Sequence, residues 1–581
     1  MSDLRALHNS RLRLMRFAVI LSLALLALGL YYFQVIHSDT YVRLASNNRL
    51  RLIRFPPVRG EIYDRNGALL AVNVTTFDIM GYPLDIERAG MVEKLAGLLS
   101  NHGLPYTEED LARSIKRQFW APYRVVRLVS NITLAQMADL VADPEFPREL
   151  FPLPVWRRIY PAGSLASNVT GYVGEISEGE LKQLGGENYA AGDLIGKNGI
   201  ERQYEELLRG FPGEESVEVD ARGRKVRTID VRPAGRGQDL HLTLDLGAQR
   251  LAADLMKGHR GAIAVMDANT GEVLVLYSSP SYDNNPLAWG VSTREWSALI
   301  NDPEKPMHDR SISGVYPPAS TFKALVALAA LEEKEVVPRT SVVCTGAFTL
   351  GNRTFRCWKR SGHGRVNLLT ALQDSCDVYF YQAGLKLGIT KLLKWCSLFG
   401  LGAPTGIDLP GEAGGTVGGP DWKKARLKET WYHGDTVNYS IGQGFLLTTP
   451  LQIARLYAAV ANGGRLVRPR LLYAGEEDDP VLPVSKENLN QIKKGLDYVV
   501  KRGTGRRAGS YGISVAGKTG TAQNAHGPDH ALFAGYAPAD SPRYVAVAVI
   551  EAGLHGSSVA SPMVGEILSY LLVPEARSKA Q

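Results

Sequence analysis

The chain has 581 residues, of which 45% are apolar and 22% are charged, and its formal net charge is +7. This length is too great for one hydrophobic core and suggests about two to four domains. The mild positive excess fits work beside an anionic membrane or substrate, and it fits plain surface solubility equally well. Lysine and arginine form no stripe with interleaved aromatic residues, so no nucleic-acid partner is expected.

The first predicted element is an apolar helix over residues 17–36, which carries no charge. About 20 helical residues span a hydrocarbon core of roughly 30 Å. The segment ends in the aromatic run 31–33, and no small-residue cleavage site follows, so we expect an uncleaved anchor, with a retained signal peptide as the alternative. Arginines precede the anchor at positions 11, 13 and 16. Residues 1–16 are therefore expected to be a cytoplasmic tail, with the rest of the chain outside.

Residues 37–236 are predicted to form a mixed domain of short strands, turns and amphipathic helices. Asn66-Gly67 predicts a hairpin turn. Helices are predicted over 91–101, 134–143 and 196–208, and the Pro- and Gly-containing stretch 233–237 predicts a linker.

A second domain is predicted over 237–573, with 574–581 as a C-terminal tail. Its expected strands are 261–267, 273–277, 515–521, 531–536 and 544–550, and its expected helices include 244–256, 321–331 and 561–572. Strands near both ends of the domain with helices between them predict an α+β fold, in which helices cover an antiparallel sheet.

Three short motifs follow one another in this domain: Ser320-Thr321-Phe322-Lys323, Ser375-Cys376-Asp377 and Lys518-Thr519-Gly520. Each is weak alone, but their order and spacing describe acyl transfer through a serine ester, with a lysine as proton acceptor. Prolines disfavour helix before Ser320, so it is expected at a helix N-terminus, where free N–H groups favour developing negative charge. Lys323 follows one turn later on the same face.

The other two motifs supply the remaining parts of this reaction. Ser375 and Asp377 are expected to hydrogen-bond the Lys323 amine and to pass a proton on. Lys518 and Thr519 offer a charge and a hydroxyl to a substrate carboxylate, from an edge strand along which a peptide can lie. The candidate oxyanion and substrate-binding groups are the backbone N–H groups of Ser320 and Thr521, together with Gly520.

Residues 512–519 also fit the nucleotide P-loop pattern letter for letter. A P-loop needs a helix that starts at the lysine, whereas Gly520, Thr521 and then a Pro-containing loop follow Lys518. No G-x-S-x-G elbow occurs, which disfavours a Ser-His-Asp hydrolase. Neither rival is retained.

These motifs resemble those of the class B penicillin-binding proteins, and the resemblance covers nearly the whole chain. Further stretches that carry it are 438–444 and 448–452 in the second domain, and 59–60, 64–67 and 199–201 in the first. No glycosyltransferase domain is recognised, which separates the chain from class A. The second motif is Ser-x-Asp rather than Ser-x-Asn, which is similar to the elongation-type members.

The resemblance implies an elongated pedestal, or dimerisation-type, domain over 37–236 and a transpeptidase domain over 237–573. It implies a peptidoglycan D,D-transpeptidase whose Ser320 attacks stem peptides ending in D-Ala-D-Ala and is acylated by β-lactams, with no organic cofactor. Expected partners are a membrane-embedded peptidoglycan glycosyltransferase and a cell-shape scaffold protein. The expected location is the bacterial inner membrane, with the bulk of the chain in the periplasm.

Other functions stay open at this point. The enzymatic alternatives are a division-type transpeptidase and a membrane-bound D,D-carboxypeptidase. The non-enzymatic alternatives are a β-lactam sensor and an inactive scaffold.

The cysteines suggest a metal site beside the second motif. A predicted hairpin with its turn at 349–354 brings Cys344 and Cys357 together, His363 follows, and Cys376 is the middle residue of the second motif. Three thiolates and one imidazole suit a closed structural zinc site. A Cys344–Cys357 disulfide and a set of buried thiols are the alternatives. Elongation-type relatives resemble this arrangement but often use carboxylates, so the cysteine-rich set departs from them.

Overall fold

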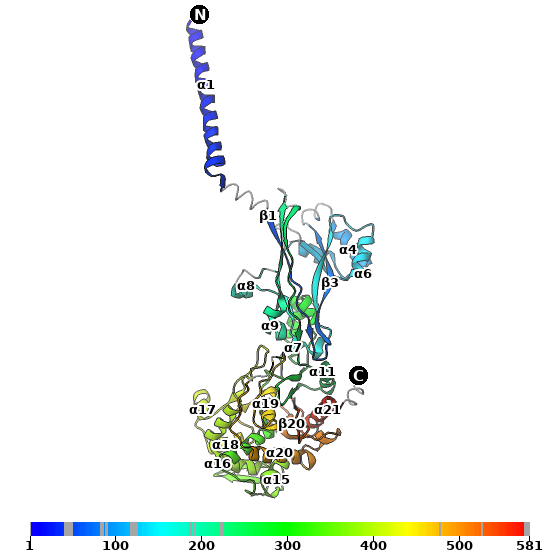
Figure 1. The fold of residues 1–581 in the computed structure, drawn as a ribbon, viewed down its shortest axis with the longest axis vertical. Helices are drawn as coiled ribbons and strands as arrows, with labels where there is room; N and C mark the ends of the chain where they lie inside the picture. The colour runs from blue at the N-terminus through cyan, green and yellow to red at the C-terminus, as the bar shows by residue number, and fades with distance from the viewer. Residues whose placement is uncertain are drawn as a thin grey trace. The chain divides into compact units, whose positions relative to one another are not determined.

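The computed structural model describes residues 2–39, 50–81, 86, 91–116, 126–184, 189–190, 192–219, 225–473, 475, 478–524 and 527–573 (Figure 1). The chain divides into two compact units. The first unit comprises Met1–Val58, Thr75–Val155 and Gly210–Arg236, and the second comprises Arg59–Val74, Trp156–Arg209 and Gly237–Gln581. A domain boundary at 236/237 stays a prediction, and it coincides with one place where the chain passes between the units. The predicted tail 574–581 lies outside the described residues.

The N-terminal apolar helix is present. Helix α1 (Ser2–Tyr31) continues into a π-helical turn, Tyr32–Ile36, so the residues before position 17 are helical as well. Within Arg11–Ile36 an 18-residue window has a mean hydropathy of 2.2 and is unburied. A helix of this length and composition is able to cross a membrane.

The first unit has its own core. Strands β1 (Leu50–Phe55), β8 (Gly213–Val219) and β9 (Lys225–Arg232) form an antiparallel sheet in the order β1-β8-β9. Strand β4 (Val126–Ile132) pairs antiparallel with the later part of β3 (Leu69–Gly81). Helices α4 (Met91–Asn101), α5 (Glu108–Lys116) and α6 (Leu134–Ala142) bury apolar side chains with β4, so the helices predicted over 91–101 and 134–143 are confirmed.

The second unit contains the predicted antiparallel sheet, in the order β12-β11-β21-β20-β19. Its strands are β11 (Gly261–Asp267), β12 (Val273–Ser279), β19 (Ala516–Ala522), β20 (His530–Ala537) and β21 (Tyr544–Ile550). Every residue of β21 is buried because helices cover both faces. Alternate side chains of the sheet belong to two different cores, as the period of two in a strand requires.

Helices α11 (Leu246–Leu255) and α21 (Ala560–Leu572) share the core of one face of the sheet. Helices α14 (Lys323–Glu332), α16 (Asp377–Leu398) and α19 (Pro450–Ala461) share the core of the other. Further helices of six or more residues in the described part of the second unit are α8 (Glu178–Leu184), α13 (Thr293–Ile300), α15 (Leu368–Gln373), α17 (Pro420–Leu427), α18 (His433–Tyr439) and α20 (Lys486–Lys501). The α+β fold class predicted from the sequence is confirmed.

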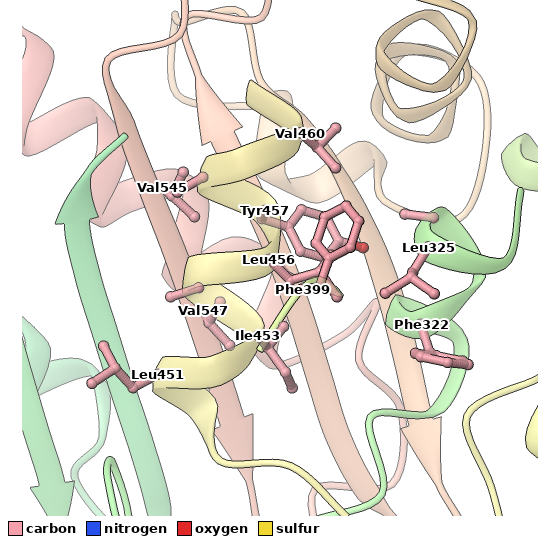
Figure 2. Close-up of a cluster of buried hydrophobic side chains, with 14 of the residues drawn as sticks. Phe322, Leu325, Phe399, Leu451, Ile453, Leu456, Tyr457, Val460, Val545 and Val547 are labelled. Atoms are coloured by element: carbon pink, nitrogen blue, oxygen red, sulfur yellow. The ribbon is translucent and has the colours of Figure 1, made fainter. Parts of the chain in front are cut away.

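Figure 2 shows α19 lying along the sheet, with Val545 and Val547 of β21 beside it. Tyr457 of α19 is completely buried, and its hydroxyl donates a hydrogen bond to the carbonyl oxygen of Thr321 at 2.9 Å. The predicted helix over 321–331 begins as a 3-10 turn, Ala319–Phe322, before α14. Helix α19 therefore fixes the backbone that leads into α14.

The stretches at 59–60 and 199–201 meet in a buried ion-pair network of the second unit. Glu201 is fully buried in α9 (Gly199–Gln203), and its two carboxylate oxygens accept hydrogen bonds from Arg59 and from Arg158, the latter at 2.7 Å. These charges lower the pKa of the Glu201 carboxyl against the opposing effect of burial. Helix α9 is followed by α10 (Glu205–Arg209), so the predicted helix over 196–208 is broken at Tyr204.

Residues 64–67 form the predicted hairpin turn. It joins β2 (Ile62–Tyr63) to the start of β3, and β10 (Leu240–His241) pairs parallel with β2.

Glu201→Gln is expected to destabilise the second unit by about 3 kcal/mol, because two buried guanidinium groups lose their anion. Urea unfolding of the purified protein measures the change. Glu180→Gln is the matched control, since Glu180 forms a more exposed ion pair with Lys197, and its effect should stay below about 1 kcal/mol. Equal effects of the two changes would contradict this account.

Candidate active site

Ser320 lies in the 3-10 turn just before α14, and it is half-buried. Among the described residues its hydroxyl has no hydrogen-bond partner. The residue before it, Ala319, has a left-handed backbone with φ +49°, and its N–H donates to Gly442 O at 2.9 Å. A Cβ on Gly442 would stand 2.2 Å from Ala319 O, so only glycine permits this approach. Such left-handed non-glycine residues cluster at functional sites.

Lys323 is the first residue of α14 and is completely buried. Its Nζ atom lies 2.6 Å from Asp377 Oδ1, 3.0 Å from Ser375 O and 3.2 Å from Ser375 Oγ. These contacts use all three N–H donors of the ammonium group. The first and second motifs therefore meet at this nitrogen.

The second motif is held from two sides. Ser375 has φ +54° between α15 and α16, and Asp377 is the first residue of α16. The backbone N–H of Trp358 donates to Asp377 Oδ2 at 2.9 Å, and the indole N–H of Trp358 donates to Asp374 O at 2.9 Å. Each oxygen of the Asp377 carboxylate thus has its own donor, one from Lys323 and one from Trp358.

The third motif lies on β19, which is an edge strand as predicted. Lys518 is fully buried, and burial followed by the charge of Lys323 holds the pKa of its ammonium well below the usual range. A Cβ on Gly520 would stand 3.3 Å from Thr321 Cγ2 and 3.4 Å from Pro318 O, so β19 lies against the Ser320 turn. Thr521 is the next residue of the strand, and its carbonyl oxygen accepts from Gln443 at 3.4 Å. All three motifs are therefore in one place.

The four predicted metal ligands also come together. Ligand atoms of Cys344, Cys357, His363 and Cys376 all lie within 4.8 Å of one another. His363 Nδ1 is 3.6 Å from Cys344 Sγ and 3.5 Å from Cys357 Sγ. The three sulfur atoms belong to buried residues, and all four cysteines of the chain are free thiols.

The predicted hairpin explains this convergence. Strands β14 (Ala347–Leu350) and β15 (Arg353–Arg356) pair, and the N–H of Cys357 donates to Gly346 O at 2.9 Å. Strand β13 (Val342–Cys344) pairs with β16 (Gly364–Val366), which begins directly after His363. A hydrogen bond with Cys376 lowers the pKa of the Cys357 thiol.

Two neighbours of the motifs were not predicted from the sequence. Trp358 holds Asp377 through its backbone, and the hydroxyl of Thr504 lies 2.8 Å from that of Thr519. Neither residue belongs to a motif, and the 3-10 turn Arg506–Gly509 separates Thr504 from β19 in the chain. Only the tertiary structure places them at the site.

Comparisons with known proteins agree with this geometry. Residues 261–569 match the family described as "Penicillin binding protein transpeptidase domain", and residues 54–242 match the "Penicillin-binding Protein dimerisation domain". The chain is 36% identical to the peptidoglycan D,D-transpeptidase MrdA of Haemophilus influenzae, over 95% of this chain and 90% of that protein.

Solved structures give the same result. The chain resembles the Helicobacter pylori penicillin-binding protein PBP2 in its complex with MreC, with a TM-score of 0.81 and 32% identity over 90% of this chain and 98% of that one. It also resembles a chain of a peptidoglycan synthase complex that coordinates polymerization and crosslinking, with a TM-score of 0.75 and 30% identity over 97% and 98% of the two chains. The chain therefore belongs to the penicillin-binding protein family, among the peptidoglycan D,D-transpeptidases of the PBP2 kind.

Proposed function

We propose that this protein cross-links peptidoglycan stem peptides through a Ser320 acyl-enzyme during cell elongation. The observation that carries the proposal is the buried Lys323 amine, one helical turn after Ser320 and in contact with both polar residues of the second motif. No histidine base is needed in such a site, because a lysine amine is also able to accept the serine proton.

In the acylation step, Ser320 Oγ attacks the carbonyl carbon of the D-Ala-D-Ala bond. The Ser320 proton passes to Lys323 Nζ, and Asp377 stabilises the ammonium that forms. Ser375 Oγ, 3.2 Å from Lys323 Nζ, gives its proton to the departing D-Ala nitrogen as the C–N bond breaks, and it takes the proton held by Lys323 in return. An amine of a neighbouring stem peptide then attacks the ester and releases Ser320.

Residues of β19 bind the substrate. Lys518 and Thr519 bind the carboxylate of the terminal D-Ala, and Gly520 lets β19 lie against the Ser320 turn. The backbone N–H groups of Ser320 and Thr521 form the oxyanion hole for the tetrahedral intermediate.

The cysteine cluster is proposed to hold a structural zinc ion. Zinc–ligand bonds of about 2.3 Å to sulfur and about 2.0 Å to nitrogen in a tetrahedron put sulfur and nitrogen about 3.6 Å apart. The observed Nδ1–Sγ distances of 3.5 and 3.6 Å fit this spacing. The bound ion would tie the residues before Trp358 and Asp377 together, and it would take no part in the acyl transfer.

We place the protein in the bacterial inner membrane through α1, with a cytoplasmic N-terminus and a periplasmic catalytic unit. The proposed partners are a membrane-embedded glycosyltransferase and a cell-shape scaffold protein. The H. pylori relative in complex with MreC and the relative within a peptidoglycan synthase complex support these partners.

Benzylpenicillin should add one acyl mass to the wild-type protein and none to Ser320→Ala, as read by intact mass spectrometry. The variant lacks the hydroxyl group that forms the ester with the drug. An unlabelled wild type would refute the proposal. Incubation with paired stem peptides separates the alternatives, since cross-linked dimers identify a transpeptidase and D-Ala release alone identifies a carboxypeptidase.

Asp377→Asn should slow acylation by benzylpenicillin on the order of 100-fold, because Lys323 loses the anion that stabilises its protonated form. The change keeps the side-chain shape and the acceptor for the Trp358 N–H. Stopped-flow or gel-based labelling with a fluorescent penicillin measures the rate. Glu333→Gln, which disrupts an ion pair at the opposite end of α14, is the control and should leave the rate within about twofold. A wild-type rate in Asp377→Asn would contradict the assigned role.

Elemental analysis should find about one zinc per chain in the protein purified without chelator, and less in Cys357→Ser. Cys396→Ser is the matched control, because Cys396 is equally buried but lies outside the cluster. Metal-free wild-type protein, or a Cys344–Cys357 disulfide found by peptide mapping, would refute the zinc site.

A further inference from the structure

We infer that Thr504 is a positioning residue that orients the Thr519 hydroxyl toward the substrate carboxylate. The inference rests on the transpeptidase function proposed above and extends it to a residue outside the three motifs. Thr504 lies in the turn Gly503–Gly505 directly after α20.

The contact itself is a single hydrogen bond. Thr504 Oγ1 and Thr519 Oγ1 are 2.8 Å apart, a normal distance for a bond between two hydroxyl groups. Among the described residues, Thr519 is the one hydrogen-bond partner of the Thr504 side chain. Thr504 is half-buried and Thr519 is 8% exposed, so bulk water is largely kept from the pair.

A bound carboxylate fixes the direction of this bond. A carboxylate only accepts hydrogen bonds, so Thr519 must use its one proton to bind it. The oxygen of Thr519 is then free to accept, and Thr504 is the donor. Donation by Thr504 polarises the Thr519 hydroxyl and strengthens its bond to the anion. Thr504 therefore acts through Thr519 without touching the substrate.

The turn is held in place by close packing. A Cβ on Gly503 would stand 2.2 Å from Gln373 O, and the Thr504 N–H donates to the same carbonyl at 3.4 Å. A Cβ on Gly505 would stand 3.0 Å from the ring of Phe533 in β20. Gln373 ends α15, two residues before Ser375. The turn thus touches the end of α15, which leads into the second motif, and the sheet that carries the third.

The charge around the turn also suits an anionic ligand. Arg502 and Arg506 flank it in sequence, and both are exposed. Exposed cations raise the local concentration of an anion nearby. Both charges lie in the segment that carries Thr504, in addition to Lys518 on β19.

The test measures acylation of the full-length detergent-solubilised protein by benzylpenicillin and by its methyl ester, which lacks the negative charge. Thr504→Val should lower the acylation rate constant for benzylpenicillin about tenfold and leave that for the ester within about twofold. Thr504→Ser, which retains the hydroxyl, should restore the preference for the acid. Thr504→Ala removes the same hydroxyl with a smaller side chain and should repeat the valine result.

A double-mutant cycle adds a second readout. Thr504→Val combined with Thr519→Val should be no slower with benzylpenicillin than Thr519→Val alone, because each change removes the same hydrogen bond between the two hydroxyl groups. Thr243→Val is the control, since Thr243 is a buried threonine whose hydroxyl donates to backbone carbonyls elsewhere in the second unit. It should keep the wild-type ratio of acid to ester rates.

Three results would overturn the inference: a wild-type rate in Thr504→Val, an equal loss with acid and ester, or additive effects in the double mutant. Each of these requires a wild-type protein that is acylated. A wild-type protein that does not react at all would instead refute the proposed function.

Discussion

The charge of Lys323 sets the main constraint on this active site. An ammonium group buried in an apolar helix is stable only when its charge is paired and its donors are used, and a partner missing from such a pair costs several kcal/mol. Asp377 and Ser375 meet both conditions. The start of α16 must therefore stay against the start of α14, and this contact brings the second motif to the first.

Asp377 links this ion pair to the cysteine cluster. Its second oxygen is held by the backbone of Trp358, which directly follows Cys357, while Cys376 directly precedes Asp377. The cysteine cluster and the ion pair thus share two short segments of chain. A structural ion in the cluster would limit the movement of the carboxylate that faces Lys323, although it lies outside the path of the acyl group.

Strain and close packing complete the site. Ala319 and Ser375 both adopt left-handed backbones, beside the proposed nucleophile and at the proton-relay serine. Gly442 and Gly503 each fill a position where a Cβ would overlap a backbone carbonyl. Such features cost free energy locally, and the extensive core on both faces of the sheet offsets them. Rigid surroundings of this kind keep catalytic groups in place before the substrate arrives.

Much of this protein was determined by local sequence. The apolar run of residues 17–36 predicts α1, and shorter continuous apolar runs predict β11, β20 and β21. The three motifs identify the candidate catalytic residues, because their short-range spacing places Lys323 one turn after Ser320. Periodicity and turn chemistry act over a few residues, so sequence alone reveals them.

The long-range contacts were decided only by the tertiary structure. Three such contacts join residues 15 or more positions apart. They are the ion pair of Arg59 with Glu201, the hydrogen bond from the Trp358 backbone N–H to Asp377, and the hydrogen bond between Thr504 and Thr519. Such contacts depend on how whole helices and strands pack, and a short sequence motif does not determine that packing. The sequence therefore identified the candidate catalytic residues and their reaction, while the fold determined which other residues contact them.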